Sequence, residues 1–228
     1  MTSTHLSDGP RQRVQPSDPG WLTVGRVATL AAIVFCLLLQ WINHDWFPPE
    51  VSVSQYGIGP RGWVFTTWSA LLAVSVLALT RGGPDLGVRR TRLVYCWLAA
   101  GSAGLVVMGI VRTDAGGAQQ SWHARTHMVG SILALLALPV GILLAIGWAR
   151  VRWRRAAVVC AAVSAVALLL VLAAALGAPT PGMDAQHSWA FWQAVAVTAD
   201  MLLVGVFALA GLPDRAAGDR DPVRTATE

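Results

Sequence analysis

The chain has 228 residues, of which 55% are hydrophobic and only 13% are charged, against about 25% charged residues in a typical soluble domain. This composition excludes a disordered chain, a collagen-like fibre and an ordinary water-soluble enzyme. The formal net charge is +5, and the sequence contains arginine but no lysine. The three cysteines, Cys36, Cys96 and Cys160, lie within apolar runs, which is not the pattern of a disulfide framework.

Six apolar segments are long enough to cross the roughly 30 Å hydrocarbon core of a bilayer as helices, which takes about 20 residues each. In chain order they cover residues 22–42, 62–80, 93–111, 127–149, 156–177 and 189–211. None alternates apolar and polar residues, and only helices or closed barrels satisfy the backbone in lipid. The sequence therefore predicts an all-α, six-helix transmembrane bundle over residues 21–211. The first segment is too long for a cleavable signal peptide and is expected to be an anchor.

The placement of arginine predicts the orientation of this bundle. The two tails, the adjoining edge of the first span and the connections after spans two and four hold 14 of the 17 arginines, whereas the other three connections hold only Arg61, Arg112 and Arg125. The positive-inside rule then places both termini in the cytoplasm and the chain in the plasma (inner) membrane. Residues 1–20 and 212–228 are predicted to be disordered cytoplasmic tails.

The arginine clusters also predict partners. Each arginine near a charged leaflet is attracted to anionic lipids, so we expect the clusters to contact such headgroups. Nucleic-acid binding is not expected, because the sequence has no basic platform interleaved with aromatic residues and no recognition module.

Each of the three connections on the predicted outer side carries at least one histidine and one acid. The first reads NHDWFPPE and contains His44 and Asp45, and the last reads PGMDAQHSW and contains Asp184 and His187. These four residues are predicted to contribute to an outward-facing polar site.

The connection that leads into the fourth span contains Asp114, His123 and His127. The two histidines are four residues apart, so both imidazoles fall on one helix face if the helix starts by Trp122. Because polar groups are costly when they face lipid, we expect the two rings to share one pocket at the outer boundary. Asp114 is expected to lie within reach of that pocket.

Three interpretations of these residues are open. In the first, the side chains only hydrogen-bond the outer loops together. In the second, His123, His127 and Asp114 are candidate catalytic residues of a proton-transfer or polar binding site. In the third, His123 and His127 bind a metal ion, with Asp114, His187 or Asp184 as the third ligand, and zinc fits these ligand types. The spacing lacks the glutamate of the HExxH zinc motif, and no other cofactor is predicted.

Asp200 is the one acid deep inside a span. It follows Trp189 by about 11 residues, or roughly 16 Å at the rise of a helix. A charge at that depth costs at least about 2.5–3.5 kcal/mol unless it is paired or faces water, so the neutral acid is favoured. The acid then either hydrogen-bonds a neighbouring helix or belongs to a proton- or ion-coupled pathway.

Two stretches carry a family resemblance. Ser54-Gln55-Tyr56, followed by Gly62-Trp63-Val64-Phe65, and Thr113-Asp114, followed by His123-xxx-His127, resemble motifs of the domain-of-unknown-function 998 family of polytopic bacterial membrane proteins. The resemblance covers about residues 20–211 and implies a membrane architecture without an agreed activity. The sixth span begins HSWAFWQAVAV, without the arginine often found there in the family.

Three functions are compatible with these features. The favoured one, given the short loops and the lack of a nucleotide motif, is a non-enzymatic accessory, scaffold or lipid-interacting protein, with a possible membrane-protein partner. The second is a membrane-embedded hydrolase or transferase that acts at the outer leaflet through His123, His127 and Asp114. The third is a small proton-coupled carrier that uses Asp200, although the sequence lacks the repeats of many carriers.

The predicted topology can be tested with single cysteines and an impermeant thiol reagent. Because the arginines divide so unevenly between the two sides, three outer positions are expected to react with reagent added outside: Glu50, Gln119 and Gly182. Three inner positions are expected to react only after permeabilisation: Pro84, Val151 and Ala217. Labelling of residues 84 and 119 from the same side would contradict the six-span arrangement.

Overall fold

Each apolar segment forms a long helix. The computed structural model describes residues 18–44, 48, 50–83, 88–115, 120–148 and 151–210. The helices are α1 (Pro19–Ile42), η1 (Val53–Gly57), α2 (Gly62–Gly82), α3 (Val88–Ile110), α4 (Trp122–Ala145), η3 (Ile146–Trp148), α5 (Val151–Ala175) and α6 (Ala185–Ala210), where η denotes a short 3-10 helix. The described residues include no strand. Six helices are long and apolar enough to cross a membrane, which confirms the predicted all-α bundle.

Some helices begin before the apolar windows do. Helix α4 starts at Trp122 and α6 at Ala185, in both cases within the preceding polar sequence. Ser121 explains the start of α4, because its hydroxyl accepts a hydrogen bond from the Ala124 N–H at 3.1 Å and so caps the first turn. Helix α1 begins at Pro19, with Asp18 as its N-cap. Residues 1–17 and 212–228 of the predicted tails lie outside the described residues.

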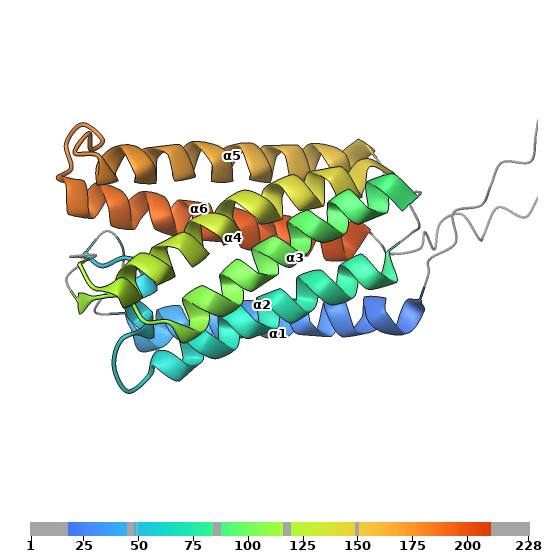
Figure 1. Cartoon of the computed structure of the whole chain (residues 1–228), viewed down its shortest axis with the longest axis horizontal. Coiled ribbons are helices and arrows are strands. Elements are labelled where there is room, and N and C mark those ends of the chain that lie inside the picture. The colour runs from blue at the N-terminus through green and yellow to red at the C-terminus, as the bar shows by residue number, and fades with distance from the viewer. Residues whose placement is uncertain are drawn as a thin grey trace, which may run out of the picture.

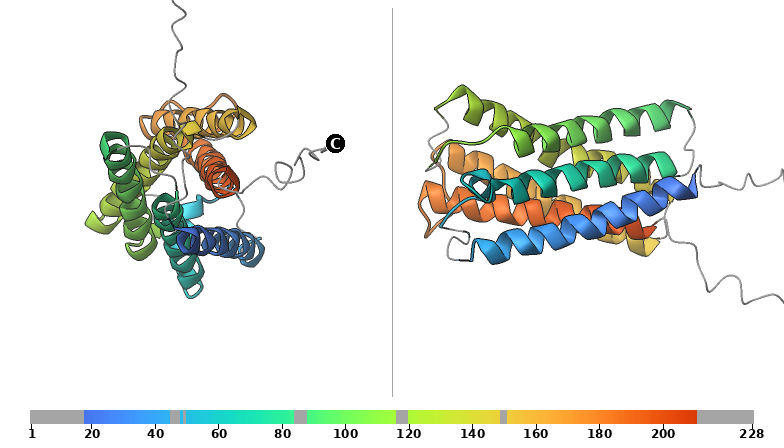
Figure 2. Two further views of the ribbon diagram at one scale, coloured as in Figure 1. Left: turned by 90° about the vertical axis from the view of Figure 1, so that its right-hand side faces the viewer. Right: turned by 90° about the horizontal axis from the view of Figure 1, so that it is seen from below.

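The long helices run alternately in opposite directions along one axis (Figure 1). The start of α1 and the end of α6 therefore lie at the same end of the bundle, here called the Arg end because Arg81, Arg89 and Arg92 are exposed there. The opposite end, here called the η1 end, holds η1 and the connections α1–α2, α3–α4 and α5–α6. Helices α1 to α4 pack in sequence and α5 packs on α6, while α4 packs more lightly on α5 and α6 (Figure 2).

The surface and the interior reverse the usual pattern of a soluble protein. Large apolar side chains point outward, as at Val27 (63% exposed), Leu30 (65%) and Leu169 (65%), which suits a lipid surrounding. Polar side chains gather instead inside the bundle. The buried ones within the long helices are Thr29, Ser69, Ser75, Ser102, His127, Ser131, Ser164, Ser188, Gln193 and Asp200.

Glycine allows α3 and α4 to approach closely. A Cβ on Gly104 would lie 2.5 Å from the Gly130 carbonyl oxygen and 2.7 Å from the Ala134 nitrogen. The two backbones are therefore so close at Gly104 that no side chain fits between them. Small residues at such positions are common between helices in membranes. The same approach brings Met108 of α3 beside Ser131 of α4, with 3.7 Å between Sδ and Oγ.

A valine at position 104 should therefore destabilise the bundle. The added side chain cannot fit against backbone atoms of α4, so we expect Gly104→Val to lower the free energy of unfolding in detergent by about 1–3 kcal/mol. Gly205→Val is the matched control, because nothing lies within 4 Å of a Cβ at that position of α6. Equal stability of the two variants would show that α3 and α4 are not in close contact.

Candidate functional site

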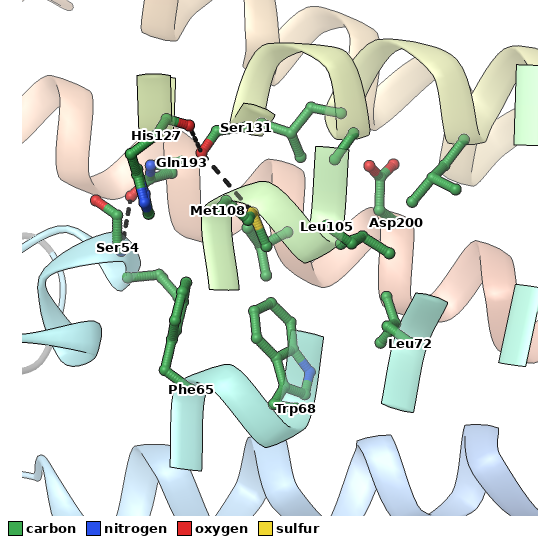
Figure 3. A pocket seen from close by; sticks show the side chains of 15 residues that line it. Ser54, Phe65, Trp68, Leu72, Leu105, Met108, His127, Ser131, Gln193 and Asp200 are labelled. Atoms are coloured by element: carbon green, nitrogen blue, oxygen red, sulfur yellow. Dashed lines mark hydrogen bonds between the residues drawn. The ribbon is translucent and has the colours of Figure 1, made fainter. Parts of the chain in front are cut away.

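A narrow cavity lies inside the bundle towards the η1 end. Its volume of about 30 Å³ is enough for one or two water molecules. Helices α2, α3, α4 and α6 and the short helix η1 all contribute side chains to it (Figure 3). Its polar lining residues are Ser54, His127, Ser131, Gln193 and Asp200, and its apolar ones include Phe65, Trp68, Leu72, Leu105 and Met108.

His127 lies on the second turn of α4 and is only 3% exposed. Its Nδ1 is 2.7 Å from the Val111 carbonyl oxygen. A carbonyl oxygen only accepts, so Nδ1 carries the proton and Nε2 of the neutral ring is an acceptor. Nε2 is buried, and although the Met108 backbone lies beside the ring, no hydrogen bond of acceptable geometry reaches Nε2 from the described residues. The ring stacks on Phe65, with centroids 6.3 Å apart, which holds its plane beside the cavity.

The buried polar groups beside His127 come from three separate segments. The Ser131 hydroxyl donates to the His127 carbonyl at 3.0 Å. The Ser54 N–H of η1 donates to Gln193 Oε1 of α6 at 3.4 Å. Figure 3 shows Ser54, Gln193 and His127 gathered at one end of the cavity. The fold thus brings η1, α4 and α6 together around the histidine, with a hydrogen bond between η1 and α6.

Asp200 lies further along α6, about two helical turns or roughly 10 Å from Gln193. It is 4% exposed. The Ser164 hydroxyl of α5 lies beside it, but no hydrogen bond of acceptable geometry reaches either carboxyl oxygen from the described residues. The structural role considered for this acid, a hydrogen bond to a neighbouring helix, has no partner here. Burial without a partner favours the neutral acid.

Asp114 folds back over the start of α4. Its carboxylate accepts from the Ser121 hydroxyl at 2.5 Å, the Ser121 N–H at 2.8 Å and the Gln120 N–H at 3.0 Å. These hydrogen bonds, led by the one from the Ser121 hydroxyl, lower the pKa of Asp114. The acid therefore fixes the first turn of α4 and, through it, the depth at which His127 enters the bundle.

His123 and His127 do not share a pocket. His123 is exposed, stacks on the Trp122 ring with centroids 3.7 Å apart, and does not line the cavity that contains His127. The spacing of four residues aligns the two positions along α4, but it does not set their depth. On the first turn His123 faces outward beside Trp122, whereas on the second turn His127 packs against Phe65.

The remaining candidates form local contacts at the η1 end. His187 binds Asp184 through its ring, with 2.7 Å between Nδ1 and Oδ2, and its Nε2 lies 3.6 Å from Glu50 Oε2. The backbone N–H and the ring of His187 lower the pKa of Asp184. His44 Nδ1 is 2.9 Å from the Trp41 carbonyl oxygen. Asp45 lies outside the described residues.

These contacts bear on the metal interpretation. Within residues 18–210, less the gaps noted above, no three His, Cys, Asp or Glu side chains come close enough to hold a metal ion. His127, one of the proposed ligands, is buried, whereas His123 is exposed and Asp114 is half-buried.

Sequence reasoning did not select Gln193, Ser54 or Ser131. Gln193 had a usable signal, because an amide within an apolar span needs an interior partner. For Ser54 the signal was only its place in the Ser54-Gln55-Tyr56 motif. Ser131 had none, since serine is common in membrane helices and its hydroxyl is often satisfied by its own backbone.

Residues 26–210 match the model of a family described as "Protein of unknown function (DUF998)". The match omits only the first seven residues of α1 among the long helices, and it confirms the resemblance inferred from the motifs. No curated protein and no solved structure matches the chain.

The unpartnered carboxyl group of Asp200 leads to a prediction about stability. Removing a buried polar group that has no hydrogen bond should relieve its desolvation cost, so we expect Asp200→Leu to keep or raise the free energy of unfolding in detergent, by up to about 1–3 kcal/mol. Asp200→Asn, which keeps a polar group of the same shape, should leave it unchanged. A loss of stability in the Leu variant alone would show that the acid holds helices together.

Proposed function

Because the chain belongs to the DUF998 family, whose function is unknown, we propose its role from the bundle interior: a small proton-coupled membrane carrier in which His127 and Asp200 take up a proton. The multi-pass architecture is the frame for this role. The proposed orientation places the η1 end outside, as the arginine distribution favours, so that protons arrive from the outer side.

One observation carries the proposal. Two ionisable side chains, His127 and Asp200, line the same buried cavity, and both Nε2 of the ring and the two carboxyl oxygens lack a hydrogen-bond partner among the described residues. Buried polar atoms are usually satisfied, so each exception calls for an explanation. Ionisable residues at membrane depth most often mark proton or ion pathways.

The surroundings of His127 suit it to receive a proton. The Val111 carbonyl holds Nδ1–H, and this hydrogen bond is kept when Nε2 is protonated as well, because the imidazolium ion donates from both nitrogens. Nε2 is therefore the atom that gains and loses the proton. One or two water molecules in the cavity would carry it on towards Asp200.

A polar route leads to the cavity from the η1 end. The Ser52 and Ser54 hydroxyls are 2.9 Å apart and hydrogen-bonded. Ser52 lines a larger cavity at the η1 end, whereas Ser54 lines the interior cavity. A hydroxyl both donates and accepts, so this pair supports proton movement between the two spaces.

Helix α4 lacks one backbone hydrogen bond beside the cavity. Pro139 lies inside the helix, and because proline has no N–H, the carbonyl of Leu135 does not receive its usual helical hydrogen bond. Leu135 and Leu138 both line the cavity. A bend at this position would change the shape of the cavity as Asp200 changes charge, which is the coupling that a carrier needs. This favours a carrier over a static scaffold.

An accessory, lipid-interacting role is the second candidate. Arg89 and Arg92 of α3 and Arg154 and Arg155 of α5 are exposed at the Arg end, where we propose that they contact anionic headgroups of the cytoplasmic leaflet of the plasma membrane. The hypothesis of a hydrolase or transferase has no comparable support, because its candidate residues, His123, His127 and Asp114, do not line one pocket.

Infrared difference spectroscopy of the reconstituted full chain tests proton uptake by Asp200. We expect a carbonyl band of a buried carboxylic acid that loses intensity in alkaline buffer, shifts in heavy water and is absent in Asp200→Asn. Ser164→Ala is the matched control, since it alters a buried neighbour of the acid outside the cavity lining and should retain the band. His127→Gln should slow the exchange into heavy water.

Two results would contradict the proposal. A carboxylic acid band that neither responds to pH nor exchanges in heavy water would mean that the acid is sealed off. Exchange at the parent rate in His127→Gln would mean that the histidine is not on the route.

A further inference from the structure

The η1 end contains a second and much larger cavity, here called the vestibule, with a volume of about 530 Å³. It lies between η1, the start of α4, the last turn of α5 and the first turns of α6. Its size falls within the roughly 300–1,000 Å³ of small-molecule sites. The proposed proton route enters this cavity through Ser52 alone, so the rest of the vestibule lining calls for an occupant of its own.

The polar lining of the vestibule is uncharged. It consists of Ser52, Gln55, Thr113, Gln186 and Trp189. Three of these residues are each at least nine-tenths buried and come from two separate segments: Ser52, Gln55 and Thr113. Packing therefore holds this part of the lining in place. Hydroxyl and amide groups both donate and accept hydrogen bonds, which matches a ligand whose own groups do the same.

Among the residues that the structure describes, the vestibule lining contains no cationic side chain that could pair with an anionic ligand. Asp184 immediately precedes the lining residues at the start of α6, and its carboxylate and that of Glu50 both lie against His187. The two carboxylates and the imidazole together carry a charge of −1 or −2, and the exposed Arg112, next to the lining residue Thr113, offsets one of these charges. An anion would gain nothing there, whereas an uncharged ligand is unaffected.

The other side of the vestibule lining is apolar and adjoins the lipid-facing surface of the bundle. Met128 of α4 and Ala174 and Ala175 of α5 line it, and α4 and α5 pack only lightly on each other. The next residue of α4, Val129, is 62% exposed on the lipid-facing surface. A ligand with an apolar part can therefore extend from the vestibule into the surrounding lipid between these two helices.

We propose that the vestibule binds the neutral polyhydroxyl headgroup, of the sugar or glycerol type, of a membrane lipid. The hydroxyls of the headgroup pair with Ser52, Gln55, Thr113 and Gln186, and the indole of Trp189 covers the apolar C–H face of the headgroup, since an indole combines an apolar surface with a polar edge. The acyl chains lie along the lipid-facing surface of α4 and α5. The site stands whether or not the interior takes up protons.

Native mass spectrometry of the full chain in detergent micelles tests this site, with a monoglucosyl diacylglycerol as the probe and phosphatidylglycerol as the anionic comparison. We expect the glucosyl lipid to occupy half of the protein at a concentration roughly tenfold lower than phosphatidylglycerol requires. Gln55→Leu and Gln186→Leu should each weaken its binding roughly tenfold, because headgroup hydroxyls then lose a partner. Gln186 is exposed, so its variant does not depend on how the buried Gln55 affects folding.

A space-filling variant provides a matched comparison. Ala175→Trp fills the vestibule and should abolish binding of the glucosyl lipid, whereas Leu176→Trp, at the next position of α5, which is 87% exposed and outside the lining, should not change it. Unaltered binding in Ala175→Trp, or equal binding of the two lipids, would overturn the proposal. Binding of free methyl glucoside as tight as that of the lipid would assign the site to a soluble sugar and overturn the lipid part.

Discussion

The cost of exposing a polar group to hydrocarbon is the constraint on which the rest of this structure depends. It drives the backbone into helices that satisfy their own hydrogen bonds, and it turns serine, glutamine, histidine and aspartate side chains away from the surface. In a bundle of six helices these groups can avoid the lipid only by facing the interior. Residues far apart in the chain, such as Ser54, His127 and Gln193, therefore lie beside one cavity. The site follows from this inward sorting.

The ends of two helices hold the histidine in that site. Helix α3 ends at Ile110, and the carbonyl of the following residue, Val111, has no further helical N–H to accept from. The His127 ring fills that role. On the other side, Asp114 and Ser121 fix the first turn of α4. A short connection between two antiparallel helices thereby sets the position, plane and tautomer of a buried imidazole.

Hydropathy alone predicted the six helices, because a span is a property of one continuous segment. Asp200 and His127 could also be selected from residue type and position, since ionisable groups inside or next to apolar runs are rare. The predicted partnership of His123 with His127 failed for a different reason: helical spacing defines a shared side of a helix, while the depth of each turn depends on neighbours such as Phe65 that are distant in sequence. Gln193 and Ser54 meet only through tertiary packing, which local patterns do not encode.

The light contact between α4 and the last two helices has a consequence for how the protein is made. During synthesis α5 and α6 reach the bilayer after the other four, and because they pack mainly on each other, they can form a hairpin before they meet α4. Until that hairpin docks, Asp200 and Gln193 are on one unit and His127 and Ser54 are on the other. The cavity is thus created by the final step of assembly, and a chain interrupted before α6 inserts contains a complete four-helix unit but no site.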